Sequence, residues 1–79
     1  MSKRVYQLVA KVTNIESSLI DDESGPESIE SWTSFKGYVL LNELETEFKV
    51  KFTIDEAMDV KNIADIKRHL KNHGIVLDD

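Results

Sequence analysis

Apolar side chains recur every three or four residues in three separate segments of this 79-residue chain. In the first segment they are Val5, Leu8, Val9, Val12, Ile15 and Leu19. In the second they are Phe35, Tyr38, Leu40, Leu41, Leu44 and Phe48, and in the third Ile63, Ile66 and Leu70. This spacing is typical of amphipathic α-helices. The sequence therefore predicts a helical fold whose core is built from these three stripes.

Residues that are favoured at helix ends predict where the helices begin and end. We expect a first helix over residues 3–18 and a second that continues to residue 48. Thr53 and Glu56 match a capping box, which predicts a short third helix. Asn62 is a favoured N-cap and Gly74 a favoured residue just after a helix end, so a last helix is expected between them.

The segments between the stripes lack a helical period. Residues 20–33 contain Gly25-Pro26, several serines and a run of acids, and we interpret them as a long loop, a kind of segment that is often functional. Residues 49–53 alternate like a strand, but a lone strand leaves its backbone groups unpaired, so an extended linker is expected. The prediction is an all-α, small four-helix bundle forming one domain over residues 1–79.

The composition excludes several classes of function. The chain has no cysteine, which rules out disulfides, thiolate zinc sites and cysteine nucleophiles. Residues 16–47 carry nine acidic side chains and one basic one, Lys36. The negative electrostatic potential of these side chains repels nucleic acid and attracts basic protein surfaces. No apolar run resembles a signal peptide or suffices to cross a bilayer, so we expect a soluble, cytoplasmic protein that binds other proteins.

The start of the second helix carries an unusual pair of hydroxyl residues, Thr33 and Ser34. If Thr33 is the N-cap, Ser34 occupies the first helical position. The first turn of a helix presents unpaired N–H groups and the positive end of the dipole, so a phosphate ester on Ser34 would be stabilised there. Local chemistry alone favours a plainer interpretation, in which these residues only cap the helix.

Residues 31–52, SWTSFKGYVLLNELETEFKVKF, resemble the signature of the acyl carrier protein family. In that family Asp-Ser-Leu opens the second helix and a Leu-Glu-x-Glu-Phe segment closes it. Here Ser34 falls on the family's serine, and the closing segment is matched by Leu44, Glu45, Glu47 and Phe48. Residues 53–70, TIDEAMDVKNIADIKRHL, resemble the family's short third helix and its fourth.

The resemblance implies that Ser34 carries 4′-phosphopantetheine, transferred from coenzyme A by a phosphopantetheinyl transferase. The thiol of this arm would hold an acyl, polyketide or aminoacyl group as a thioester. The protein would then be a discrete, monomeric phosphoprotein of fatty acid or polyketide biosynthesis, and not itself an enzyme. The implied partners are a loading ligase or acyltransferase and synthase-type enzymes.

The resemblance also implies that partner enzymes dock along the second helix. The positions carried over as partner-binding are Thr33, Phe35, Lys36, Val39, Glu43, Glu45 and Glu47. Several of them depart from the family pattern: Thr33 replaces the usual Asp, Phe35 replaces the usual Leu, and Lys36 and Val39 stand where acids are frequent. These departures indicate an unusual set of partners.

Two other functions remain as alternatives. The first is a helical protein–protein interaction module on the same scaffold, without a prosthetic group, in which Ser34 only starts a helix. The second is a zinc site formed by Asp65, His69 and His73, which recur at intervals of four. A basic last turn with an Asp65–His69 surface pair is the preferred interpretation, so no metal site is predicted.

Two large side chains near these segments have more than one plausible role. Trp32 could contact an arm or a partner, and Met58 could line a groove for cargo. Packing is the expected role of both, because large apolar side chains in a small domain are most often buried.

Overall fold

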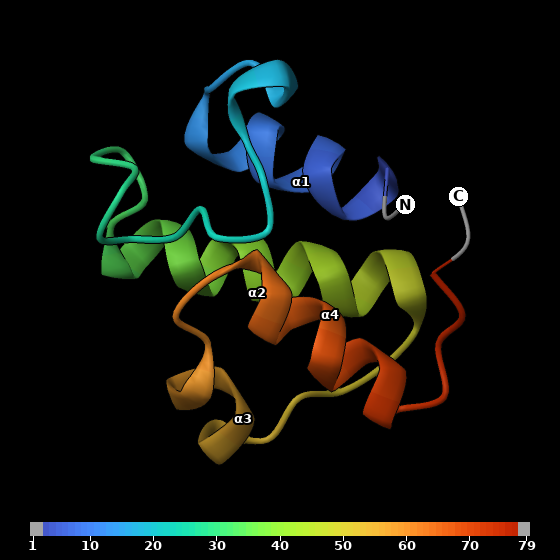
Figure 1. Ribbon diagram of the computed structural model, residues 1–79. Coiled ribbons are helices and arrows are strands. Elements are labelled where there is room, and N and C mark those ends of the chain that lie inside the picture. Colours follow the sequence, from blue (N-terminus) through green and yellow to red (C-terminus); the bar gives the residue numbers. More distant parts are fainter. Residues whose placement is uncertain (1–2, 78–79) are drawn as a thin grey trace.

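The structure is a computed structural model that describes residues 3–77. The two residues at each end of the predicted domain, 1–2 and 78–79, lie outside the described residues. Within residues 3–77 the chain contains helices and no strand (Figure 1). They are α1 (Lys3–Thr13), the 3₁₀ turn η1 (Ser17–Leu19), α2 (Ser34–Phe48), α3 (Ile54–Asp59) and α4 (Ile63–Asn72). The predicted all-α fold, with a long first connection and a short third helix, is confirmed.

The core forms around α2, which crosses the middle of the molecule between α1 on one side and α3 and α4 on the other (Figure 1). Three helices contribute the buried apolar residues Val5, Val9, Val12, Leu40, Leu44, Phe48, Ile63, Ile66 and Leu70, and the long loop contributes Ile20, Ile29 and Trp32. Burying a side chain of this size stabilises the fold by about 1.5–3 kcal/mol.

The first helix ends earlier than predicted. It stops at Thr13 and not at residue 18, because Asn14 adopts a left-handed conformation with a φ of 61°. The amide of Ile15 then donates to the carbonyl of Ala10 at 3.2 Å, which closes the helix end. Asn is one of the few residues that tolerate this conformation after a helix. As a result Leu19, which was expected to continue the apolar stripe, is exposed.

The buried stripe of α2 also differs from the prediction. Leu40, Leu44 and Phe48 are buried as expected, but Phe35 and Tyr38 are each 72% exposed. Trp32, just before the helix, fills the core at this end, and the helix turns Gly37 toward it. With 3.6 residues per turn, Tyr38 and Phe35 are rotated by about 100° and 160° from the direction of Gly37, so they point away from the core.

The long loop is held against α4 by backbone contacts. The amides of Ile63 and Ala64 donate to the carbonyls of Ser24 (3.0 Å) and Asp22 (2.9 Å). A Cβ added to Gly25 would lie 2.1 Å from the carbonyl oxygen of Lys61, so only glycine fits at this approach. The loop therefore has a defined position over the start of α4.

The linker and the two last helices agree with the prediction. Residues 50–53 form no strand, and the carboxylate of Glu45 accepts from the amide of Phe52 at 2.8 Å. Both halves of the Thr53–Glu56 capping box are present, and Asn62 accepts from the amide of Asp65 at 2.9 Å. No residue of α3 is buried, so this helix is attached to the body by other contacts.

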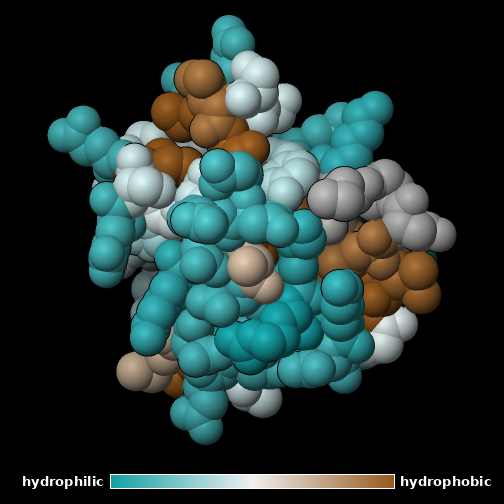
Figure 2. Space-filling model, viewed as in Figure 1, coloured by the Kyte–Doolittle hydropathy of each residue, from teal (hydrophilic) through white to brown (hydrophobic). Residues whose placement is uncertain are grey.

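The face of the molecule in Figure 2 is mostly hydrophilic, with apolar side chains gathered in smaller areas. The large apolar side chains with at least 71% exposure are Leu19, Phe35, Tyr38, Ile54, Met58 and Val76. Among the helices of residues 3–77, none combines the length and the hydropathy that a membrane span requires.

Candidate functional site

Ser34 is the first residue of α2, and its side chain is exposed. Thr33 caps the helix as predicted: its hydroxyl accepts from the amide of Lys36 at 3.2 Å, and its carbonyl accepts from the amide of Gly37 at 2.8 Å. In the described part of the chain no acceptor satisfies the amides of Ser34 and Phe35. The Ser34 hydroxyl therefore stands beside free N–H groups at the positive end of the helix dipole.

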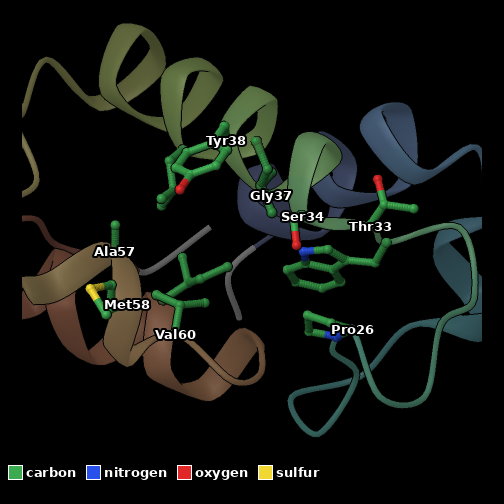
Figure 3. A pocket seen from close by; sticks show the side chains of 12 residues that line it. Pro26, Thr33, Ser34, Gly37, Tyr38, Ala57, Met58 and Val60 are labelled. Carbon is green, nitrogen blue, oxygen red and sulfur yellow. The ribbon is translucent and has the colours of Figure 1, made fainter. Parts of the chain in front are cut away.

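A pocket of about 230 Å³ opens beside Ser34. Figure 3 shows Gly37 and Tyr38 of α2 on one side, with Ala57, Met58 and Val60 from α3 and its end on the other. Pro26 of the long loop also borders the pocket, away from Met58. Apart from a few polar groups, the pocket is lined by apolar side chains. The site thus combines an anion-binding helix end with a space for an apolar group.

The sequence left open that Met58 lines a groove for cargo, but core packing was the preferred prediction, and for Met58 that preference is wrong. Met58 was expected in the core, whereas it is 78% exposed and lines the pocket. Trp32 is buried, as expected for a packing residue, and it also lines the pocket. A further sequence signal at the pocket is the unfavourable glycine at position 37, inside a helix.

The acidic residues predicted to bind partners make contacts within the chain. Glu43 pairs with Lys11 at 3.2 Å and Glu47 pairs with Arg4 at 3.3 Å. Glu45 is bound to the amide of Phe52, so it fixes the linker after α2. The structure therefore ties all three side chains to neighbouring segments.

The remaining predicted partner positions surround Ser34 at the start of α2. Phe35 is well exposed, and Lys36 and Val39 are half-buried. Thr33 is exposed and its hydroxyl acts as the cap. Close to Ser34 the surface is thus aromatic and basic, without an acidic side chain between residues 34 and 42.

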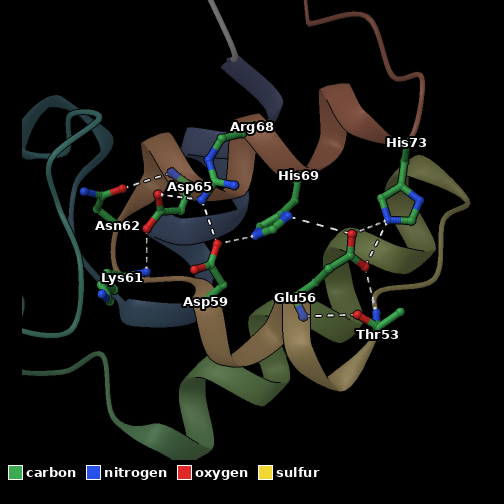
Figure 4. Close-up of polar contacts among 9 residues, drawn as sticks. All are labelled: Thr53, Glu56, Asp59, Lys61, Asn62, Asp65, Arg68, His69 and His73. Atoms are coloured by element: carbon green, nitrogen blue, oxygen red, sulfur yellow. Dashed lines mark hydrogen bonds and ion pairs between the residues drawn. The ribbon is translucent and has the colours of Figure 1, made fainter.

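The expected Asp65–His69 surface pair is wrong (Figure 4). His69 is 7% exposed, and its Nε2 lies 3.0 Å from a carboxylate oxygen of Asp59. Asp65 binds instead the amide of Lys61 at 2.9 Å and the guanidinium of Arg68 at 3.1 Å. His69 was misplaced because its burial depends on α3 folding back over α4, which no local pattern encodes.

The two histidines join α3 to α4. The Nε2 of His73 lies 2.9 Å from Glu56, while Asp59 contacts both His69 and Arg68 (Figure 4). The hydrogen bond from Arg68, and then that from His69, lower the pKa of the Asp59 carboxyl. Asp65, His69 and His73 do not converge, and residues 3–77 contain no group of three or more His, Cys, Asp or Glu side chains placed to hold a metal ion. These contacts hold the outer wall of the pocket in place.

Comparison with known proteins identifies the family. A family model described as phosphopantetheine attachment site matches residues 3–70, which include α1, α2, α3 and most of α4. No curated protein matches the sequence. Members of the family hold a covalently attached phosphopantetheine arm, are generally not catalytic, and interact with modifying and synthase enzymes. The chain therefore belongs to the phosphopantetheine attachment site family, to which the acyl carrier proteins belong, and is a phosphopantetheine-carrying carrier protein.

Proposed function

We propose that Ser34 is the residue that bears the arm, and that residues 1–79 act as a single carrier domain. The cargo is an acyl, polyketide or aminoacyl group, which the domain delivers to biosynthetic enzymes. One observation carries this proposal: Ser34 presents an exposed hydroxyl at the start of α2, inside the region that matches the family and at the mouth of an apolar pocket.

The residues at this helix start fit a phosphodiester. Attachment removes the proton from the Ser34 hydroxyl and forms a bond from its oxygen to the phosphorus of coenzyme A, and adenosine 3′,5′-bisphosphate leaves. The amides of Ser34 and Phe35 and the helix dipole favour the negative charge of the resulting ester. Because Thr33 already satisfies the amide of Lys36, the helix start keeps its shape with or without the ester.

The bound arm supplies a terminal thiol that holds the cargo as a thioester. The pocket beside Ser34 supports a sheltering role for the protein, because Leu40, Leu41 and Met58 give it an apolar lining. Its volume of about 230 Å³ exceeds the roughly 150 Å³ of an engineered cavity that binds benzene. A short acyl chain or a single ring would fit this space, and longer groups would extend into solvent.

Partner enzymes must reach Ser34, so we propose that they contact Phe35, Lys36 and Val39 around it. The same surface would serve the phosphopantetheinyl transferase, the loading ligase or acyltransferase, and synthase-type enzymes. The exposure of Phe35 supports this assignment, since apolar side chains near the centre of an interface contribute most to binding.

Intact mass spectrometry tests the attachment residue. The protein is incubated with coenzyme A and a broad-specificity phosphopantetheinyl transferase, beside the variants Ser34→Ala and Ser18→Ala. Ser18 is an exposed serine of η1 and serves as the matched control. We expect the wild type and Ser18→Ala to gain the mass of one arm and Ser34→Ala to gain none.

Two results would contradict the proposal. A mass gain retained in Ser34→Ala would place the arm on another residue. No gain in the wild type with several transferases would favour the alternative, a helical interaction module that carries no arm.

A further inference from the structure

Trp32 has an unusual environment beside Ser34. Its side chain is only 4% exposed, yet its one polar atom, Nε1, has no hydrogen-bond partner in the structure of residues 3–77. Buried indole N–H groups usually find an acceptor, because leaving such a donor unpaired is unfavourable. The unpaired donor therefore calls for a partner from outside the described chain.

Gly37 lies directly in front of this donor. It is the fourth residue of α2, and inside a helix glycine is less favourable than any residue except proline. A Cβ at this position would lie 3.6 Å from Nε1 of Trp32, so the missing side chain leaves the approach to Nε1 open. An unpaired buried donor and an unfavourable glycine thus lie next to each other. Such breaks of local rules are expected at functional sites.

Both residues line the pocket that opens beside Ser34. Within residues 3–77 the one side-chain polar atom that is sealed from solvent without a partner is Nδ1 of His69, on α4. Nε1 of Trp32 is therefore not sealed, and a group entering the pocket can reach it. The pocket is otherwise mostly apolar, so this N–H group is a specific feature in it.

We propose that Nε1–H of Trp32 donates a hydrogen bond to a carbonyl oxygen of the group tethered at Ser34, and that Gly37 keeps its path open. This inference rests on the proposed function, because it requires an arm on Ser34. The oxygen belongs either to an amide of the arm or to an oxygenated acyl cargo, such as a 3-oxoacyl group. In both cases the acceptor is a carbonyl oxygen on the chain tethered at Ser34, and the pocket that receives it is mostly apolar.

The chain contains one tryptophan, so its indole gives a single N–H signal in a ¹⁵N-labelled sample. We would record this signal for the unmodified protein, the protein with the arm alone, and the protein loaded with butanoyl or 3-oxobutanoyl groups. A hydrogen bond moves the signal downfield and slows its exchange with solvent, by roughly 2- to 12-fold for a bond of ordinary strength.

The four samples distinguish the two sources of the oxygen. A change that is already present with the arm alone assigns the acceptor to the arm. A change that appears only with an acyl group assigns it to the cargo: to the thioester carbonyl if both acyl groups cause it, and to the 3-oxo group if only 3-oxobutanoyl does. If the indole signal is the same in the unmodified protein and in all three modified forms, Nε1 donates only to solvent and the inference is overturned.

Two variants check the geometry. Gly37→Ala places a methyl group against Nε1, so the change of the indole signal on loading should be lost or clearly reduced. Tyr38→Phe removes the other aromatic donor that lines the pocket and is the matched control, in which the change should persist. Equal loss in both variants would overturn the role given to Trp32.

A third variant provides a readout without the indole. In Trp32→Phe the ring is largely kept and the donor is removed. In the wild type, loading with the acceptor-bearing group should raise the melting temperature above that of the unmodified protein. In Trp32→Phe the same loading should no longer raise it. If this variant does not fold, the Gly37→Ala spectra still decide the question.

Intact mass measured before each spectrum separates this inference from the proposed function. A chain that gains no arm contradicts both. A chain that is modified at Ser34, but whose indole signal does not respond, contradicts only the role of Trp32 and Gly37.

Discussion

Thr33, Thr53 and Asn62 each stand just before a helix, and each side chain accepts a hydrogen bond from the amide three residues on. Such contacts span only four residues, so the local sequence is enough to predict them. Histidine burial is different. His69 is buried, and its Nε2 meets the carboxylate of Asp59, which lies ten residues earlier on α3.

The cap of α2 allows a prediction about Thr33, which stands where the acyl carrier family usually has Asp. Thr33→Ala removes the acceptor for the amide of Lys36 and should lower the free energy of unfolding by about 1 kcal/mol. Thr33→Asp keeps an acceptor and should stay close to the wild type. Urea unfolding measures both, and an equal loss in the two variants would show that the cap does not stabilise the helix.

At the level of whole elements, α2 presents two distinct faces. Its inward face runs through Leu40, Leu44 and Phe48, while its first turns expose Phe35 and Tyr38. The periodicity of apolar residues is compatible with either stripe, because the helix is apolar around much of its circumference near the start. Trp32 decides between them by occupying the core position there.

Two glycines should respond to the same substitution with opposite signs. In Gly25→Ala the new Cβ would meet the carbonyl of Lys61 at 2.1 Å, which forces the loop away from α4 and should cost about 1–3 kcal/mol. In Gly37→Ala the new Cβ makes only an ordinary contact, so the better helix propensity should stabilise by about 0.5–1 kcal/mol. Chemical denaturation of both variants tests this, and a loss in Gly37→Ala would contradict it.

The two faces of α2 also predict which side chains affect modification. Phe35→Ala removes an exposed aromatic contact next to Ser34 and should lower kcat/KM of a phosphopantetheinyl transferase roughly tenfold, or about 1.4 kcal/mol. Glu43→Gln is the control, because Glu43 is paired with Lys11 and should matter little. If Glu43→Gln slowed the reaction as much as Phe35→Ala, docking would depend on the acids.

Across the whole molecule, a cluster of three residues joins three separate segments. Asp22 of the long loop binds Lys67 of α4 at 2.7 Å and accepts a hydrogen bond from the hydroxyl of Tyr6 on α1. The bonds from Lys67 and Tyr6 lower the pKa of Asp22. The bond to Asp22, followed by burial, raises the pKa of Tyr6. The loop is thereby tied to both outer helices.

These shifts predict how stability depends on pH. The folded pKa of Asp22 lies below its ordinary value of 3.8, so its contribution is present above that value and lost as pH falls through the folded pKa. The folded pKa of Tyr6 lies above 10.0, so its contribution is present below pH 10.0 and lost as pH rises through the folded pKa. The free energy of unfolding should therefore decline at both extremes.

Urea unfolding across this pH range, with Asp22→Asn beside the exposed control Glu16→Gln, provides the measurement. Asp22→Asn should weaken both declines, since both involve this carboxyl. Part of the acid decline should remain, because the pKa values of Glu56, Asp59 and Asp65 are lowered as well. A pH profile of Asp22→Asn identical to that of the wild type would contradict the role of the cluster.

The existence of the helices, their caps and the position of Ser34 at the start of α2 were all predictable from the order of residues. Each depends on neighbours within a turn or two, and such short-range preferences are encoded locally. The early end of α1 was missed, because Asn14 can either continue a helix or stop it.

The pocket beside Ser34, the outward turn of Phe35 and the pairing of the α2 acids with other segments required the folded chain. The pocket and the acid pairs join residues far apart in sequence: Tyr38 faces Met58, Glu43 meets Lys11, and Glu47 meets Arg4. Phe35 turns outward because Trp32 fills the core at this end once the helices have packed. Which distant segments meet depends on how all the apolar stripes pack together at once, and no single stretch of sequence carries that information.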